Sequence, residues 1–167
     1  MRIAGLRSLQ RRELIHPDDL SAALTDRDPR VRIAGLDIAA GRDDPPIIDL
    51  LDDPDPAVVE TAAWACGERT NEPDPPIHRL SRLAERHDDP LVREAAVAAL
   101  GALGNAEGLA AILAATNDKP AIRRRAVLAL ASFEGPEVDL AWLRARTDRD
   151  RQVCDAVEEL LGPASAD

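Results

Sequence analysis

Apolar residues recur along most of the chain with the period of about 3.6 residues that is typical of an amphipathic helix. The clearest stripe consists of Val92, Ala95, Ala96, Ala99, Leu100 and Leu103. Shorter apolar segments around residues 77–83 and 109–113 predict shorter helices between the long ones. No stretch of four or more residues alternates between apolar and polar with period 2. The pattern therefore predicts an all-α protein without strands.

The long helices share an opening motif, in which a proline stands two residues before a β-branched residue and usually follows aspartate. Aspartate is a favourable N-cap, and proline fits the first helical position because it loses no hydrogen bond there. The motif recurs about every 30 residues, which is the length of one helical hairpin. Its copies are Asp28–Val31, Asp55–Val58, Asp89–Val92 and Lys119–Ile122, with a degenerate copy at Asp150–Val153.

This repetition predicts an α-solenoid, an α-α superhelix of about five two-helix repeats plus a leading half repeat. In each repeat a short helix, A, precedes the long helix that carries the motif, B. The second repeat is expected to have a trimmed A helix and to regain its length in the loop at residues 70–76. We expect one repeat domain over residues 1–162 and a short tail over 163–167. The expected helix ends are marked by glycine, at Gly41, Gly67, Gly101, Gly104, Gly135 and Gly162.

The two ends of the predicted stack differ. The segment Arg2–Leu6 is repeated letter for letter as Arg32–Leu36, so the chain begins inside a B helix. That helix is expected to be uncapped and to expose Ile3, Leu6 and Leu9, which predicts fraying or a homodimer through this surface. At the other end, Glu158 stands where earlier repeats carry a hydrophobic residue, as a terminal capping repeat requires.

Composition and charge narrow the possible partners. The net charge of −10 argues against a nucleic-acid partner, because binding to a phosphate backbone depends on Lys and Arg. The excess of acid lies in residues 37–118, which carry 17 acidic and 6 basic side chains. No apolar run is long enough to span a membrane, and the first residues do not form a secretory signal. Cys66 and Cys154 are expected to be reduced thiols. We therefore expect a cytoplasmic protein.

The hairpins resemble HEAT-like repeats in the short form first described in phycobilisome bilin lyases. The resemblance rests on the sequence Asp-Pro-x-Val-Arg at residues 28–32 and 89–93 and on the run of small residues and leucines from Ala95 to Gly104. It implies a ladder of charged pairs between neighbouring hairpins, formed by Asp28, Asp55 and Asp89 with Arg32, Arg93 and Arg123. Val59 and Cys154 replace the arginine in the second and fifth repeats, where the ladder is expected to be broken.

Similar repeats occur in some enzymes, whose characteristic residues are largely missing from this sequence. Deoxyhypusine hydroxylase holds iron with His-Glu pairs, whereas none of His16, His78 and His87 is followed by Glu, so we expect no metal site. The two cysteines have no histidine in the same hairpin, and the residues support neither a catalytic centre nor a cofactor. Some HEAT-like DNA glycosylases use a basic surface. Residues 123–125 are all arginine, so a nucleic-acid-binding protein remains an alternative. The shared repeat alone leaves an accessory protein of a lyase-type enzyme as a further alternative.

The remaining hypothesis is a non-catalytic scaffold that binds a protein or peptide on the concave face, which B helices usually line. The outward positions of the B helices mix apolar side chains with both signs of charge, which suits a protein or peptide partner. Trp64 is the expected anchor. The predicted partner-binding residues are Arg30, Ile33, Glu60, Trp64, Leu91, Glu94, Arg124 and Leu128.

Overall fold

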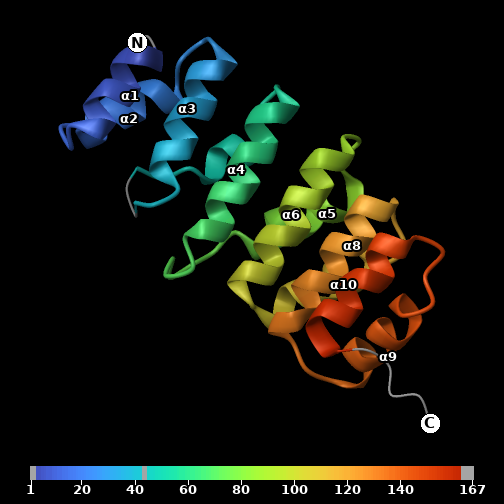
Figure 1. Cartoon of the computed structure of the whole chain (residues 1–167). Helices are drawn as coiled ribbons and strands as arrows, with labels where there is room; N and C mark the ends of the chain where they lie inside the picture. The colour runs from blue at the N-terminus through green and yellow to red at the C-terminus, as the bar shows by residue number, and fades with distance from the viewer. Residues whose placement is uncertain (1–2, 43–44, 163–167) are drawn as a thin grey trace. The chain divides into compact units, whose positions relative to one another are not determined.

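The computed structural model describes residues 3–42 and 45–162, and every regular element in these ranges is a helix (Figure 1). The chain forms two compact units, residues 1–76 and 77–167. The single repeat domain expected over residues 1–162 stays a prediction, and the tail at 163–167 lies outside the described residues. The all-α prediction is confirmed.

The described part of unit 1 contains four α-helices and one short 3-10 helix. Its core is built by Leu6, Leu20, Val31 and Ile38 with their smaller neighbours. The short A helix expected in the second repeat is the 3-10 helix η1. The elements are α1 (Ile3–Arg11), α2 (Pro17–Leu24), α3 (Pro29–Ala39), η1 (Ile48–Asp52) and α4 (Pro56–Glu68).

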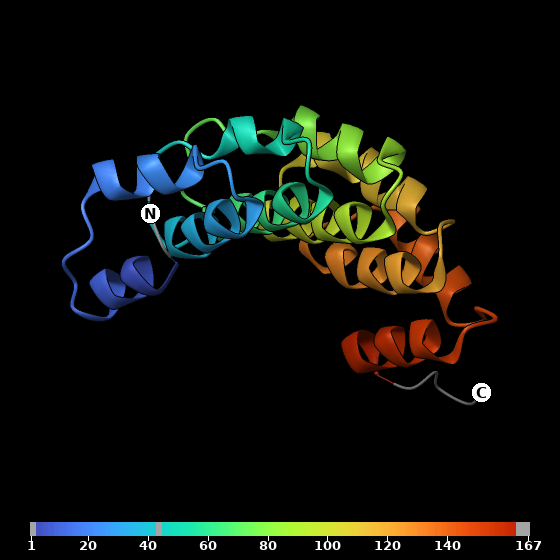
Figure 2. The same ribbon diagram turned by 90° about the horizontal axis from the view of Figure 1, so that it is seen from above.

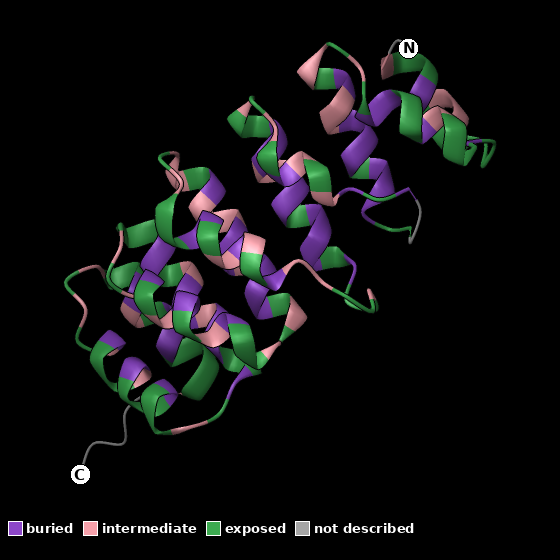
Figure 3. Ribbon diagram, turned by 180° about the vertical axis from the view of Figure 1, so that it is seen from behind, coloured by how far each residue is buried: buried purple, intermediate pink, exposed green. Residues whose placement is uncertain are grey.

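Over residues 77–162, unit 2 contains three complete hairpins. The B helices α6, α8 and α10 pack side by side, and the A helices α5, α7 and α9 form a second layer against them (Figure 2). Buried and exposed positions alternate along each helix (Figure 3). The elements are α5 (Ile77–Arg86), α6 (Pro90–Leu103), η2 (Ala106–Gly108), α7 (Leu109–Ala115), α8 (Pro120–Ala129), η3 (Leu130–Ser132), α9 (Pro136–Ala145) and α10 (Arg151–Leu161).

The aspartate caps are formed as the opening motif predicts. The side chains of Asp28, Asp55, Asp89 and Asp150 each accept a hydrogen bond from the backbone N–H two residues later, at 2.9–3.0 Å. Each bond satisfies one of the N–H groups that the first turn of a helix leaves without a partner. The B helices α3, α4, α6 and α10 therefore begin where the sequence predicts.

Three of the glycines expected at helix ends do not mark them. Gly67 and Gly101 lie inside α4 and α6, and Gly135 begins α9 instead of ending a helix. A Cβ atom on Gly101 would lie 2.6 Å from the Cβ atom of Ala129, so this glycine lets α6 and α8 approach closely. Gly104 does end α6, in the left-handed conformation with φ of 60°.

The first helix is better covered than the sequence suggests. The prediction that α1 exposes Leu6 is wrong, because Leu6 is completely buried in the core of unit 1. Ile3 and Leu9 are partly buried against the same core, and α1 contacts α3. The other positions of α1 are polar, small or charged. The homodimer stays a prediction, without the exposed leucine that motivated it.

Candidate partner-binding face

In unit 1 the predicted partner-binding residues lie on neighbouring helices. Arg30 and Ile33 are on α3, whereas Glu60 and Trp64 are on α4, which packs against α3. Trp64 is 41% exposed, an unusual state for the largest apolar side chain. The guanidinium of Arg30 is already engaged, since it donates to both carboxylate oxygens of Asp28 at 3.0 and 2.8 Å. Trp64 is therefore the most accessible apolar group of this set.

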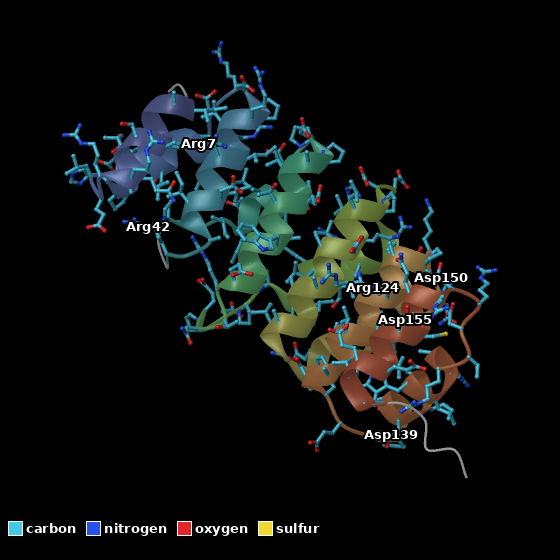
Figure 4. All side chains as sticks on the ribbon, in the orientation of Figure 1. Arg7, Arg42, Arg124, Asp139, Asp150 and Asp155 are labelled. Carbon is cyan, nitrogen blue, oxygen red and sulfur yellow. The ribbon has the colours of Figure 1, made fainter. Side chains whose placement is uncertain are left out.

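In unit 2 the predicted residues lie on α6 and α8. Leu91 is 55% exposed at the start of α6, and Leu128 is half-buried against the core formed by α8, α9 and α10. Arg124 is exposed on α8, on the same side of the unit as Asp155 of α10 (Figure 4). Glu94 is partly buried and accepts a hydrogen bond from Arg125 at 3.4 Å. Arg124 is one of the predicted binding residues, whereas Arg125 is not among them.

Arg125 also borders a hollow between α6 and α8. The hollow has a volume of about 230 Å³ and is lined by Ala98, Ala102, Leu128 and Ser132 beside Arg125. The Nε atom of Arg125 is buried and has no hydrogen-bond partner among the described residues. A buried donor without a partner is costly and is readily satisfied by a bound acceptor. This hollow adds a concave element to the predicted face of unit 2.

The charged ladder exists, but its acids are not the ones that the resemblance implies. Arg32, Arg93 and Arg123 each donate two hydrogen bonds, 2.7–3.0 Å long, to Asp53, Asp118 and Asp148 respectively. We call each such pair a rung. The pairing with Asp28, Asp55 and Asp89 is wrong, because these carboxylates cap their own helices.

Each rung ties a B helix to the turn that precedes the next B helix. Asp53 and Asp148 accept a further bond from the backbone N–H of the capping aspartate two residues later, at 2.9 and 2.8 Å. The acid therefore holds both the arginine and the start of the next helix. The hydrogen bonds from Arg123 and Arg93 lower the pKa of Asp148 and Asp118. The Asp-x-Asp spacing in the sequence carried the signal for Asp53 and Asp148, whereas Asp118 lies directly before Lys119 and lacks that spacing.

The sequence breaks the ladder at two places, as expected. Val59 replaces the arginine of the second repeat, and His87 stands where other repeats carry the acid of a rung. The ring nitrogen Nδ1 of His87 accepts a hydrogen bond from the backbone N–H of Asp89, so this histidine shapes a turn. Cys154 replaces the arginine of the fifth repeat. Its thiol donates to the carbonyl of Asp148, much as Arg93 donates to the carbonyl of His87.

A second arginine that the sequence analysis missed stabilises unit 1. Arg69 is buried and donates to the carbonyl oxygens of Ala39 and Pro45, with the closest contacts at 2.9 Å. The Ala39 carbonyl lies in the last turn of α3, where backbone acceptors have no partner within the helix. Arg69 therefore caps the C-terminal end of α3 and stabilises the fold of unit 1. Sequence alone gave no sign of this role, because the residues it joins are 30 positions apart.

A second hollow of unit 2 lies between α7 and α9. Its volume is about 340 Å³, and its walls include Leu113, Asn117, Leu140 and Arg144. Asp148 and Arg123 also line it, but they neutralise each other in a rung. Among the described residues, no group of three or more His, Cys, Asp or Glu side chains could hold a metal ion.

Comparison with known families decides how these hairpins are classified. The family model for HEAT repeats matches residues 17–77 and 77–162, with a boundary at the same place as the division into two units. The chain belongs to the HEAT-repeat family. The more specific resemblance to the bilin lyase type of repeat stays a prediction. No curated protein sequence is significantly similar to this HEAT-repeat protein.

Solved structures support the same architecture. The crystal structure of an engineered protein from the Northeast Structural Genomics Consortium has a TM-score of 0.63 and 18% identity, covering 96% of this chain and 83% of that chain. A designed armadillo repeat protein in complex with peptide (KR)4 has a TM-score of 0.65 and 17% identity, covering 93% and 84%. These similarities concern the fold. Of the helices that the structure describes, none is long and apolar enough to cross a membrane.

Proposed function

We propose that this HEAT-repeat protein is a non-catalytic scaffold that binds a protein or peptide on the outward, concave face of its B helices. The observation that carries the proposal is the exposure of Trp64 on α4. The other side of α4 is fully packed, because Val58, Ala62 and Ala65 are buried. An exposed tryptophan on a helix whose opposite side is packed marks a site where a partner covers apolar surface.

Unit 2 supports the proposal independently. Leu91 is exposed on the same face of α6 that carries Glu94, and the hollow beside Leu128 offers a place for a side chain of the partner. A combination of apolar groups, paired charges and a shallow hollow is typical of a protein interface. The designed armadillo repeat protein of similar fold is in complex with a peptide, which supports the proposal of a protein or peptide partner. Because both cysteines are free thiols, we propose a cytoplasmic setting.

The test is capture of partners by the full chain from a lysate of its source organism, followed by the same capture with variants. Trp64→Ala and Arg124→Glu change the proposed face, and Leu143→Ala is the matched control. Leu143 is 65% exposed, but it lies on the A helix α9. We expect at least one partner to be lost with Trp64→Ala or Arg124→Glu and kept with Leu143→Ala, with helicity and melting temperature unchanged.

Two results would contradict the proposal. If every captured protein survives both face variants, the face is wrong. If the only specific material recovered is nucleic acid, with binding that falls steeply as salt rises, the class of partner is wrong.

A further inference from the structure

The hollow between α6 and α8 exists because the residues that α6 contributes to it are all small. They are Ala98, Gly101 and Ala102. The B helices α4 and α8 carry Trp64 and Leu128 at the ninth position, where α6 carries Ala98. The volume of about 230 Å³ is therefore space that a larger side chain at this position would occupy.

The other wall of the hollow supplies polar groups. Arg125 and Ser132 both line it and lie seven residues apart, which is about 10 Å along a helix. Leu128 and Ala129 line the stretch between them. A group bound in the hollow thus meets apolar side chains flanked by a guanidinium and a hydroxyl.

The guanidinium of Arg125 forms only half of the hydrogen-bond pair that it could form. Its Nη2 atom donates to Glu94 at 3.4 Å, and its buried Nε atom has no partner among the described residues. In the rungs of Arg93 and Arg123, the same two atoms bind one carboxylate at 2.7–3.0 Å. A buried donor without an acceptor is costly. The side chain of Arg125 is 40% exposed, so its head group can turn toward an acceptor in the hollow.

The charges near the hollow favour an anion. Arg124 is exposed, directly precedes Arg125, and forms no ion pair within the described part of the chain. Glu94 is already hydrogen-bonded to Arg125. Unit 2 as a whole carries 12 basic and 15 acidic residues, whereas unit 1 carries 9 and 16. An acidic partner is therefore repelled less by unit 2 than by unit 1.

We infer that the hollow beside Arg125 binds a glutamate or aspartate side chain of an acidic peptide segment. The inference rests on the proposed function and specifies the class of partner for unit 2. The methylene groups of the bound side chain cover Ala98 and Ala102, and its carboxylate accepts hydrogen bonds from Arg125, as the acids of the rungs do. The hydroxyl of Ser132 can donate to the backbone of the same peptide. The bound carboxylate competes with Glu94 for Arg125.

The experiment is a fluorescence-anisotropy titration of the full chain with a labelled eight-residue peptide of alternating glutamate and alanine, blocked at both ends. Blocked peptides with glutamine or lysine in place of glutamate serve as comparisons. A glutamine peptide with a free C-terminal carboxylate tests the other source of a carboxylate in a peptide.

Two variants test the two parts of the site. We expect Arg125→Gln, which removes the guanidinium, and Ala98→Leu, which fills the hollow without changing a charge, each to weaken binding of the glutamate peptide about tenfold or more. The controls Arg149→Gln and Ala114→Leu make the same changes at exposed positions outside the hollow and should retain most of the affinity.

A third variant tests the competition. Glu94→Gln removes the carboxylate that holds Arg125, so we expect it to tighten binding of the glutamate peptide by about threefold or more. Glu134→Gln removes the same charge at an exposed position outside the hollow and should change the affinity less.

The outcomes separate this inference from the proposed function. Absence of saturable binding by the glutamate peptide would overturn the inference. So would equal effects of Arg125→Gln and Arg149→Gln, or of Glu94→Gln and Glu134→Gln, since these results show attraction to the overall charge alone. If a glutamine, lysine or free-carboxylate peptide binds instead and is lost with Ala98→Leu, the inference is wrong and the scaffold function stands.

Capture from lysate adds a second separation. If captured partners survive Arg125→Gln and Ala98→Leu but are lost with Trp64→Ala, the inference fails alone. If they survive all three changes, the proposed face fails with it. Helicity and melting temperature of every variant show whether it is folded.

Discussion

At the scale of single residues, the closest packing of unit 2 depends on the missing side chain of Gly101. The Cα atom of Ala129 lies 2.7 Å from the place where a Cβ atom of residue 101 would stand, and a backbone atom cannot rotate away. Ordinarily, alanine in place of glycine stabilises a helix by roughly 0.5–1 kcal/mol. Here steric overlap opposes that gain.

We therefore expect Gly101→Ala to lower the free energy of unfolding by about 1–3 kcal/mol, the usual cost of overpacking. Gly5→Ala is the matched control, because Gly5 lies in α1 with no atom within 4 Å of its would-be Cβ atom. That variant should be neutral or more stable. Urea unfolding of both proteins measures the difference, and an equal or higher stability of the Gly101 variant would disprove the close contact.

At the scale of elements, the helix starts could be predicted from the sequence, whereas the hydrogen bonds that join one helix to the next hairpin could not. The N-cap of an Asp-Pro pair depends on residues that are adjacent in the chain, so Asp28, Asp55 and Asp89 were placed correctly. The partner of Arg32 depends on how a hairpin folds back, which local sequence does not encode. The same reason explains why Arg69 was missed and why Gly101 was mistaken for a helix end. Its role depends on a residue of the next hairpin.

The rungs make the stability of the protein depend on pH in a defined direction. The pKa of Asp118 and of Asp148 is lower in the folded state than in the unfolded chain, mainly because of hydrogen bonds from Arg93 and Arg123. Their contribution is therefore fully present above the ordinary aspartate pKa of about 3.9 and is lost as the pH falls through the lower folded-state value.

Replacing one of these acids should show the effect. We expect Asp148→Asn to be less stable by about 1–3 kcal/mol at pH 7, because a charge-assisted pair is lost. It should also lose less stability than the original chain between about pH 5 and pH 2. Asp74→Asn, at an exposed loop position, is the control. Parallel acid-unfolding curves for the original chain and the Asp148 variant, followed by circular dichroism, would argue against this role for the rung.

At the scale of the whole molecule, the stack should respond locally to damage, because repeat proteins are stabilised mainly by contacts between neighbours. Leu100 is completely buried in α6, and α6 contacts α5 and α8. We expect Leu100→Ala to cost about 2–5 kcal/mol, the usual range for a buried leucine. Leu143→Ala removes the same atoms from an exposed site and should stay within about 0.5 kcal/mol of the original chain.

Hydrogen exchange adds the location of the change. After Leu100→Ala, protection of the backbone amides from exchange should fall more in α5, α6 and α8 than in α1, α2 and α3 of unit 1. An equal loss of protection in both units would instead favour the single domain predicted for residues 1–162. The number of hairpins could be predicted from the sequence, because the opening motif recurs about every 30 residues. The division after Pro76 follows from the distribution of contacts, which the period does not reveal.

The rungs also restrict how such a chain can evolve by duplication. Each rung joins an arginine in one hairpin to an acid in the turn before the next B helix. A duplicated hairpin therefore carries the acid of one rung and the arginine of another. A hairpin that carries the arginine can be followed only by one that brings the acid, or a charge loses its counterpart. Val59 and His87 depart from the pattern together, one lacking the arginine and the other the acid. Hairpins that lack the arginine or the acid are therefore not interchangeable with the others, because each rung needs an arginine in one hairpin and an acid in the next.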